Sequence, residues 1–347
     1  MDQPISYAMR NTEALSHWLN FNAPSELKDW SFLAIEFILV VGAICTILHA
    51  VRHYKENGSY SALLTLLGAF GYGLLCDIAS YYTVENFWHG EFSVMLVYNR
   101  LPLYIALFYP VVIYHICMTI RRYEFSRTVE TISTAFYAGL TYMIFDNLGP
   151  MLNWWIWDRA DPTTWPYLNA VPVTSYFWWF SFTGAFALVS RIVCWDWIEQ
   201  GKSPQLIGAG VAVIPVLVCV AGAALFVPYN MLAYNGMIPQ AATMYAVVFG
   251  LSGLTFVLNF RKPSVPRDRL LMIFPLVYLA GHLFIYVAKF EIYFSVDANG
   301  LSAEGLAVGN LIVAMIATIA TTTITLVSHP TDSPPLDRLR PDQPETA

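Results

Sequence analysis

The chain has 347 residues, of which 57% are hydrophobic and only 12% are charged, and its mean hydropathy is +0.52. About a quarter of the residues of a soluble domain are charged, so this composition excludes an ordinary soluble fold and indicates a lipid environment. The formal net charge of −6 comes without a run of basic residues, which argues against nucleic acid as a partner.

Hydrophobic runs of roughly 20 residues, the length that crosses ~30 Å of hydrocarbon, recur along the whole chain. They predict an all-α, polytopic transmembrane helical bundle of about nine helices, within a range of seven to nine. The predicted spans are residues 31–50, 61–82, 100–120, 129–149, 172–193, 204–228, 240–260, 269–290 and 304–327.

The predicted transmembrane domain, residues 31–327, is flanked by two polar segments. Residues 1–30 are predicted to form a polar to amphipathic N-terminal tail. Residues 328–347 are rich in proline and charge, and too poor in apolar residues to fold alone. This second segment is therefore predicted to be a disordered cytoplasmic tail.

Lys and Arg are unevenly divided between the two ends of these spans. If the nine helices alternate in direction, one side receives five of these residues and the other receives thirteen. Cationic loops stay in the cytoplasm, so the N-terminus is predicted to be non-cytoplasmic and the C-terminus cytoplasmic. The expected localisation is a multi-pass protein of the plasma membrane or the endoplasmic reticulum, depending on the organism.

Several carboxylates fall on the non-cytoplasmic side in this topology. Glu36 is early in the first span, Asp77 is late in the second, and Asp146 is late in the fourth, while Glu85 follows the second span. A carboxyl group facing hydrocarbon is costly, so such residues turn toward a cavity or a partner. The alternatives are structural hydrogen-bonding groups and, for Asp146, a solvated helix end.

Aromatic and polar side chains gather around these acids. They come mainly from "VENFWHGEF", residues 84–92, and from "FDNLGPMLNWWIWD", residues 145–158. Trp and Tyr also form belts at the membrane interface in proteins of every function, so a simple belt is the alternative to a pocket lining. The predicted substrate-binding residues are Asn86, Trp88, Asn147, Trp154, Trp155, Trp157, Asp158, Asn169, Tyr176 and His282.

An acid in an apolar pocket lined by aromatic rings suits isoprenoid chemistry. Burial favours the neutral form of a carboxyl group, which can protonate an alkene or open an epoxide. Aromatic faces stabilise the resulting carbocation by cation–π attraction. A second carboxylate can then take a proton from the neighbouring carbon or from an attacking water.

The order of these features resembles that of known membrane enzymes. A helix with an acid and a Glu-containing loop precede "LPLYIALFYPVVIY", "DNLGPMLNWWIWD" and "WPYLNAVPVTSYFWWF". This pattern is similar to the integral-membrane carotenoid hydratase and cyclase families and to membrane-bound terpene cyclases, over roughly residues 31–185. The chain departs from the pattern at Ala170 and Ser175, where those relatives have Gly and Asn.

The resemblance implies an isoprenoid-modifying enzyme with Asp146 and Glu85 as acid and base, supported by Glu36 and Asp77. The favoured function is a terpene cyclase of the isomerase or lyase class, which protonates an alkene or epoxide of a prenylated lipid taken from the bilayer. A carotenoid-type hydratase or isomerase, a membrane transporter or receptor, and an accessory subunit are the alternatives.

No cofactor or metal is expected for this chemistry. The sequence has no Gly-rich nucleotide loop and no Asp-rich motif for metal-bound diphosphate. His49 and His53 share one helix face, but no third ligand is apparent near them. The expected partners are therefore the hydrophobic isoprenoid substrate and membrane lipids.

Overall fold

The structure, a computed structural model, describes residues 18–261, 263, 267–298 and 300–329. Most of the two tails predicted at residues 1–30 and 328–347 therefore lies outside the described residues. Within the described ranges the chain forms nine helical rods, which confirms the predicted all-α bundle. The rods are α2 (Trp30–Asn57), α3 (Ser61–Thr83), α4 to α5 (Leu103–Arg121), α6 (Arg127–Asp146), α7 to α8 (Val173–Glu199), α9 (Pro204–Tyr234), α10 (Ile238–Asn259), α11 (Arg269–Ala288) and α12 (Leu311–Val327).

Seven of these rods are long and apolar enough to cross a membrane, so the chain is a multi-pass membrane protein. The other two are α12, which has only 17 residues, and α6, which is richer in Thr, Ser and charge. The last rod begins at Leu311 rather than at the predicted residue 304, because the Asn310 side chain accepts a hydrogen bond from the Val313 N–H and caps the helix there.

Two of the rods are not regular α-helices along their whole length. In the third rod, α4 (Leu103–Phe108) and α5 (Tyr114–Arg121) are joined by the π-helical turn η2 (Tyr109–Ile113). Pro110 lies inside this turn and has no N–H to donate to the helix ladder. Widened turns of this kind are frequent at functional sites, and this one contains Tyr109.

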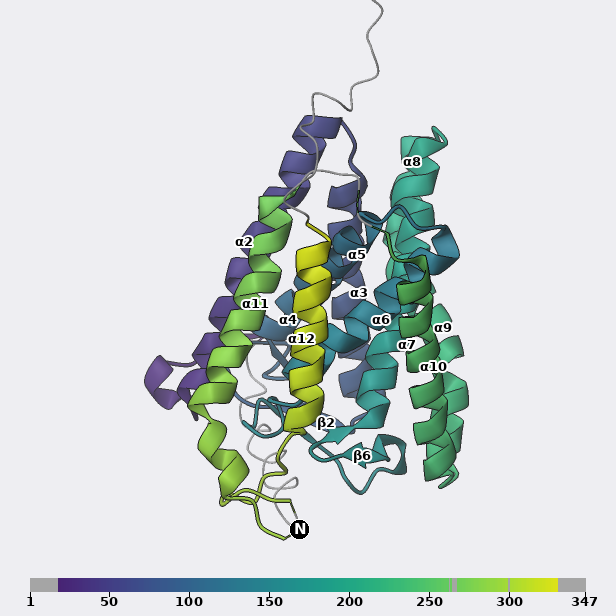
Figure 1. Ribbon diagram of the computed structural model, residues 1–347. Helices are drawn as coiled ribbons and strands as arrows, with labels where there is room; N and C mark the ends of the chain where they lie inside the picture. Colours follow the sequence, from purple (N-terminus) through teal and green to yellow (C-terminus); the bar gives the residue numbers. More distant parts are fainter. Residues whose placement is uncertain (1–17, 262, 264–266, 299, 330–347) are drawn as a thin grey trace, which may run out of the picture.

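Short strands cover one end of the bundle, the lower end in Figure 1. These strands pair the loops that connect the helices at this end. Their pairing provides hydrogen-bond partners for backbone N–H and C=O groups that lie outside the helices. The pairing that matters for the site joins β2 (Phe87–His89) to β5 (Trp155–Trp157), with His89 opposite Trp155. The other strands are β1 (Leu19–Phe21), β3 (Val94–Leu96), β4 (Leu101–Pro102), β6 (Tyr167–Leu168) and β7 (Val171–Pro172).

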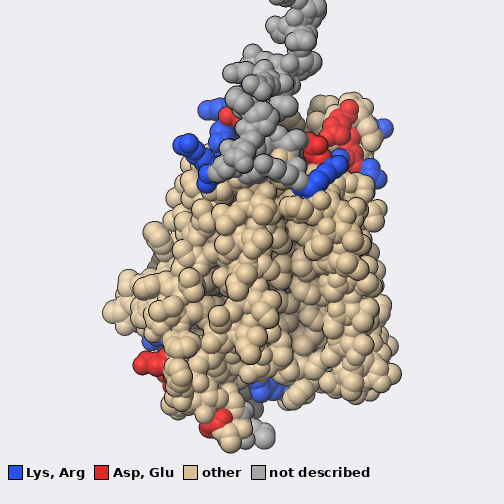
Figure 2. Space-filling view, viewed as in Figure 1, with Lys and Arg blue, Asp and Glu red and all other residues tan. Residues whose placement is uncertain are grey.

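Charged side chains distinguish the two ends of the molecule from its middle. On the face drawn in Figure 2 the middle band is uncharged, and Lys and Arg gather mainly at the end opposite the strands. At that end Glu130 binds Arg121 and Arg191 at 3.1 and 3.3 Å, and Arg191 also binds Asp196 at 2.7 Å. These ion pairs tie together α5, α6 and the end of the α7 rod.

Candidate functional site

A cavity of about 460 Å³ lies near the strand-bearing end of the bundle. Its walls come from α3, the α4 rod, α6, α7 and α9, and the paired strands β2 and β5 cover it. Much of the lining is aromatic, as expected of a pocket for an apolar ligand. The aromatic lining residues are Phe87, Phe108, Tyr109, Tyr142, Phe145, Trp155, Trp157, Trp178, Trp179, Phe182 and Phe226.

Asp77 is the acidic residue in this lining. Its side chain is buried, with an exposed fraction of 4%. Oδ1 accepts a hydrogen bond of 2.8 Å from the hydroxyl of Tyr109, whereas Oδ2 has no hydrogen-bond partner among the described residues. An unpaired buried oxygen is costly, so this half of the carboxyl group is available to a ligand.

The position of Tyr109 depends on Gly73, one helical turn before Asp77. A Cβ atom at Gly73 would lie 2.4 Å from Cβ of Tyr109, so only glycine lets the π-helical turn approach α3 this closely. Tyr109 is not among the site residues predicted from the sequence. The only local signal for it was the proline that follows it inside an otherwise helical pattern.

Asp146, the proton donor implied by the resemblance, lies outside this lining. It is fully buried at the end of α6, and neither of its oxygens has a hydrogen-bond partner among the described residues. Ser175 lies beside it without forming a well-aligned hydrogen bond. Ser175 lines the cavity, and its hydroxyl donates to that of Tyr142 at 3.3 Å. Asp146 thus lies behind one wall of the cavity.

His89 closes the cavity from strand β2. Its ring packs edge-on against Trp155, and its Nδ1 lies 3.4 Å from the hydroxyl of Tyr104. Burial lowers the pKa of His89 to about 3, although a hydrogen bond with the backbone of Trp154 raises it in part. The ring is therefore neutral near pH 7 and can accept a proton.

Asn86, Trp155 and Trp157, three of the residues predicted to bind substrate, also line the cavity. The amide of Asn86 donates to the hydroxyl of Thr163 at 3.3 Å. The indole N–H groups of Trp155 and Trp157 have no hydrogen-bond partner among the described residues. The two loops selected from the sequence therefore meet over one cavity, through the pairing of β2 with β5.

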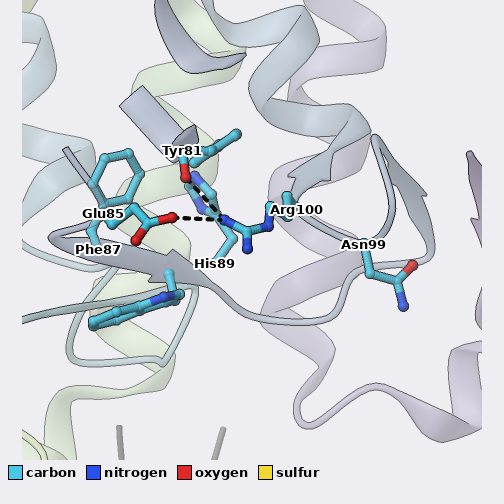
Figure 3. A pocket seen from close by; sticks show the side chains of 7 residues that line it. Tyr81, Glu85, Phe87, His89, Asn99 and Arg100 are labelled. Carbon is cyan, nitrogen blue, oxygen red and sulfur yellow. Dashed lines mark hydrogen bonds and ion pairs between the residues drawn. The ribbon is translucent and has the colours of Figure 1, made fainter. Parts of the chain in front are cut away.

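Glu85 and Trp88 line a second, smaller pocket of about 60 Å³. Figure 3 shows this pocket, in which the carboxylate of Glu85 points toward the guanidinium of Arg100 at 3.8 Å. The side chain of Glu85 is 59% exposed, and Arg100 also donates to the carbonyl of Tyr81. Glu85 thus belongs to a solvated ion pair, and among the described residues only His89 and Phe87 line both pockets.

The remaining predicted site residues hold the surrounding structure together. Glu36 accepts hydrogen bonds from the N–H and the hydroxyl of Ser93 at 3.1 and 2.6 Å, which anchors the β3 loop to α2. Nδ1 of His282 donates to the Tyr278 carbonyl, 2.7 Å away, and its Nε2 has no partner among the described residues. The others outside the cavity lining are Asn147, Trp154, Asp158, Asn169 and Tyr176.

The two histidines considered for a metal are engaged in other contacts. His49 lies 2.6 Å from the hydroxyl of Tyr114 and 3.2 Å from the carboxylate of Asp268. His53 packs edge-on against Trp195. Within the described part of the chain, no group of three His, Cys, Asp or Glu side chains is placed to hold a metal ion.

Residues 12–256 match the model of a protein family described as a domain of unknown function (DUF7802). The match covers more than two thirds of the chain and contains every residue that lines the cavity. No curated protein and no solved structure matches the chain.

Proposed function

We propose a function from the site itself, because the chain belongs to the family of the domain of unknown function DUF7802, whose description assigns no activity. The proposed function is that of an integral-membrane enzyme that protonates an alkene or epoxide of a prenylated or polyene lipid. The favoured reaction is a cyclisation. The observation that carries this proposal is the unpartnered Oδ2 of Asp77 in an aromatic cavity.

In this reaction the protonated carboxyl of Asp77 gives its proton to one carbon of the double bond. A C–H bond forms, the π bond breaks, and a carbocation forms on the second carbon. Attack by another double bond of the same substrate closes a ring and moves the cation. The neutral ring of His89 or the carboxylate of Asp77 then accepts a proton from the neighbouring carbon, so the product has the mass of the substrate.

The aromatic lining supports a reaction through a cation. Tyr142 and Trp179 stack with ring centroids 4.7 Å apart, and Phe108 lies 5.2 Å from Trp179. Such faces attract positive charge without offering a strong nucleophile. Tyr109 positions Asp77 through its hydrogen bond, and its own ring lies 5.4 Å from that of Trp179.

The closed inner end of the cavity favours an enzyme over a transporter. The lining on α3 begins at Cys76, and the lining on α9 begins at Cys219. Beyond this level the two helices pack directly, since a Cβ atom at Gly71 would lie 3.1 Å from Pro215. A secondary transporter needs a path that opens alternately to both sides, and this packing supports a pocket with one opening.

We also propose that the strand-bearing end lies outside the cytoplasm, in the plasma membrane or the endoplasmic reticulum. The support is the excess of Lys and Arg at the opposite end, since cationic loops remain cytoplasmic.

The reaction is tested by mass spectrometry of lipid extracts from cells that express the wild type, Asp77→Asn or Asp146→Asn and are fed prenylated and polyene precursors. We expect a product of unchanged mass and altered retention, lost in Asp77→Asn. A gain of one water, equally lost in that variant, would instead mean a hydratase. A product that persists in Asp77→Asn, or no turnover of any precursor by the wild type, would overturn the proposal.

A further inference from the structure

The outer part of the cavity has a different chemistry from its aromatic interior. Near the strand-bearing end, its lining contains uncharged polar side chains, those of Thr83, Asn86, Thr163, Thr174 and Asn230. Asp77 is the only Asp, Glu, Lys or Arg among the lining residues that the structure describes. A phosphate group is normally held by Arg, Lys or a helix N-terminus, so this lining favours a ligand without anionic groups.

The side chain of Asn230, on α9, has an unpaired hydrogen-bond acceptor in this outer part of the cavity. Its side-chain Oδ1 is buried and has no hydrogen-bond partner in the described part of the chain. The neighbouring residue Tyr229 contacts the hydroxyl of Thr174 at 3.2 Å, which holds the start of α7 beside this segment of α9. A hydroxyl group of a ligand can donate to Oδ1 of Asn230, and the amide of Asn230 can donate to a carbonyl.

The cavity also reaches the side of the bundle between α3 and α9. Ala79 and Thr83 of α3, and Val84 directly after it, line the cavity and are exposed on the outer surface as well, and Val84 is 51% exposed. On the opposite side of the opening, Ala223 and Phe226 of α9 are half-buried lining residues. A ligand dissolved in the bilayer can therefore approach the cavity sideways.

We propose that Asn230 and Thr174 form a subsite that binds the hydroxyl or carbonyl group of an uncharged lipid, which lies between α3 and α9 with its apolar part toward Asp77. This inference rests on the proposed function for one point only, which is the identification of this cavity as the binding site for the lipid.

The test measures binding to the purified full chain in detergent, with farnesol as an uncharged probe and farnesyl diphosphate as an anionic one. Quenching of the fluorescence of the lining tryptophans reports binding. We expect farnesol to bind at least tenfold more tightly than the diphosphate, and Asn230→Leu to weaken farnesol binding at least tenfold.

Two further variants separate this subsite from a general loss of structure. Asn259→Leu changes an exposed asparagine at the end of α10 and should leave farnesol binding unchanged. Ala223→Trp should fill the opening and abolish binding of farnesol while the thermal unfolding temperature stays near that of the wild type. Unchanged farnesol binding in Asn230→Leu, or equal binding of the two probes, would overturn the inference.

The outcome also separates this inference from the proposed reaction. If farnesol binding depends on Asn230 but no lipid is turned over, the subsite stands and the enzymatic proposal fails. If a precursor is turned over with the same KM in Asn230→Leu as in the wild type, the reaction stands and the subsite fails.

Discussion

The hydroxyl of Tyr109 donates to Oδ1 of Asp77 across 2.8 Å, from a π-helical turn of one helix to the last third of another. The bond leaves Oδ2 as the carboxyl oxygen without a partner in the described structure. Because the tyrosine holds one oxygen, the orientation of the other is defined within the cavity. Binding and protonation of a substrate at Asp77 therefore depend on a side chain contributed by a different helix.

Tyr109→Phe should lower turnover about tenfold, because a carboxyl group without its partner rotates away from the reactive orientation. The lost buried hydrogen bond should cost about 1 kcal/mol of unfolding free energy. Tyr137→Phe is the matched control, since the Tyr137 hydroxyl contacts Thr325 at 2.8 Å outside the cavity lining. Product formation and thermal unfolding are measured for both variants. An equal loss of turnover in the two would contradict a special role for Tyr109.

Gly149→Ala should disturb the cavity wall formed by Trp155. A Cβ atom at Gly149 would lie 2.0 Å from the Trp155 ring, and overpacking of this kind costs about 1–3 kcal/mol. We expect a red shift in tryptophan emission and loss of turnover. Gly208→Ala is the control, because a Cβ atom there meets nothing within 4 Å, and alanine raises helix stability by up to ~1 kcal/mol. The proposed packing is wrong if both variants keep the wild-type emission spectrum.

Glu130→Gln should destabilise the charged end of the bundle. Glu130 binds both Arg121 and Arg191 in a site where its own side chain is 7% exposed. Removal of one member of a buried ion pair costs roughly 3–5 kcal/mol, since it leaves an unpaired charge. Glu56→Gln breaks an exposed pair with Arg52 and should cost less than ~1 kcal/mol. Thermal unfolding of the two variants is compared, and similar losses would contradict the network.

Stability should fall as the pH drops from 7 to 5, in part because of His89. Its pKa is about 3 in the folded chain, well below the ordinary value of 6.5. Between these two values the unfolded chain binds a proton that the folded chain excludes, so acid favours unfolding. A lowering of this size corresponds to about 2 kcal/mol lost at pH 5.

The measurement is the thermal unfolding temperature as a function of pH. His89→Gln should show a shallower decrease below pH 6.5 than the wild type, because Gln does not titrate. The His329 ring, for which burial also lowers the pKa to about 3, should retain its own contribution in that variant. Parallel curves for His89→Gln and the wild type would show that His89 is not held neutral.

The proposed orientation predicts opposite labelling of two exposed positions. Glu304 lies at the strand-bearing side and Lys202 lies in the turn before α9, and each is replaced by cysteine in turn. The native cysteines are buried or half-buried, which keeps the background low. A membrane-impermeant maleimide should label Glu304→Cys in intact cells and Lys202→Cys only after permeabilisation. The reverse pattern would mean that the N-terminus is cytoplasmic.

The helices could be predicted because the properties that define them are local. The span predicted at residues 61–82 is α3 (Ser61–Thr83), and the one predicted at 269–290 is α11 (Arg269–Ala288). Hydrophobic length, caps and charged ends are properties of neighbouring residues in the sequence. The fourth span was predicted to reach residue 149, but α6 ends at Asp146 and the chain continues in turns through Gly149 and Pro150.

The roles of the acids were decided only by the tertiary structure. The sequence alone determined that Glu36, Asp77, Glu85 and Asp146 are carboxylates near one end of a helical bundle. Which of them lines the cavity depends on the rotation of each helix about its axis and on strand pairing between distant loops. Because of those contacts, Asp77 lines the cavity and Asp146 lies behind its wall. Glu36 accepts a hydrogen bond from Ser93, and Glu85 forms an ion pair with Arg100. A hydrophobic pattern shows that a helix is buried, but packing against other helices determines what each of its side chains meets.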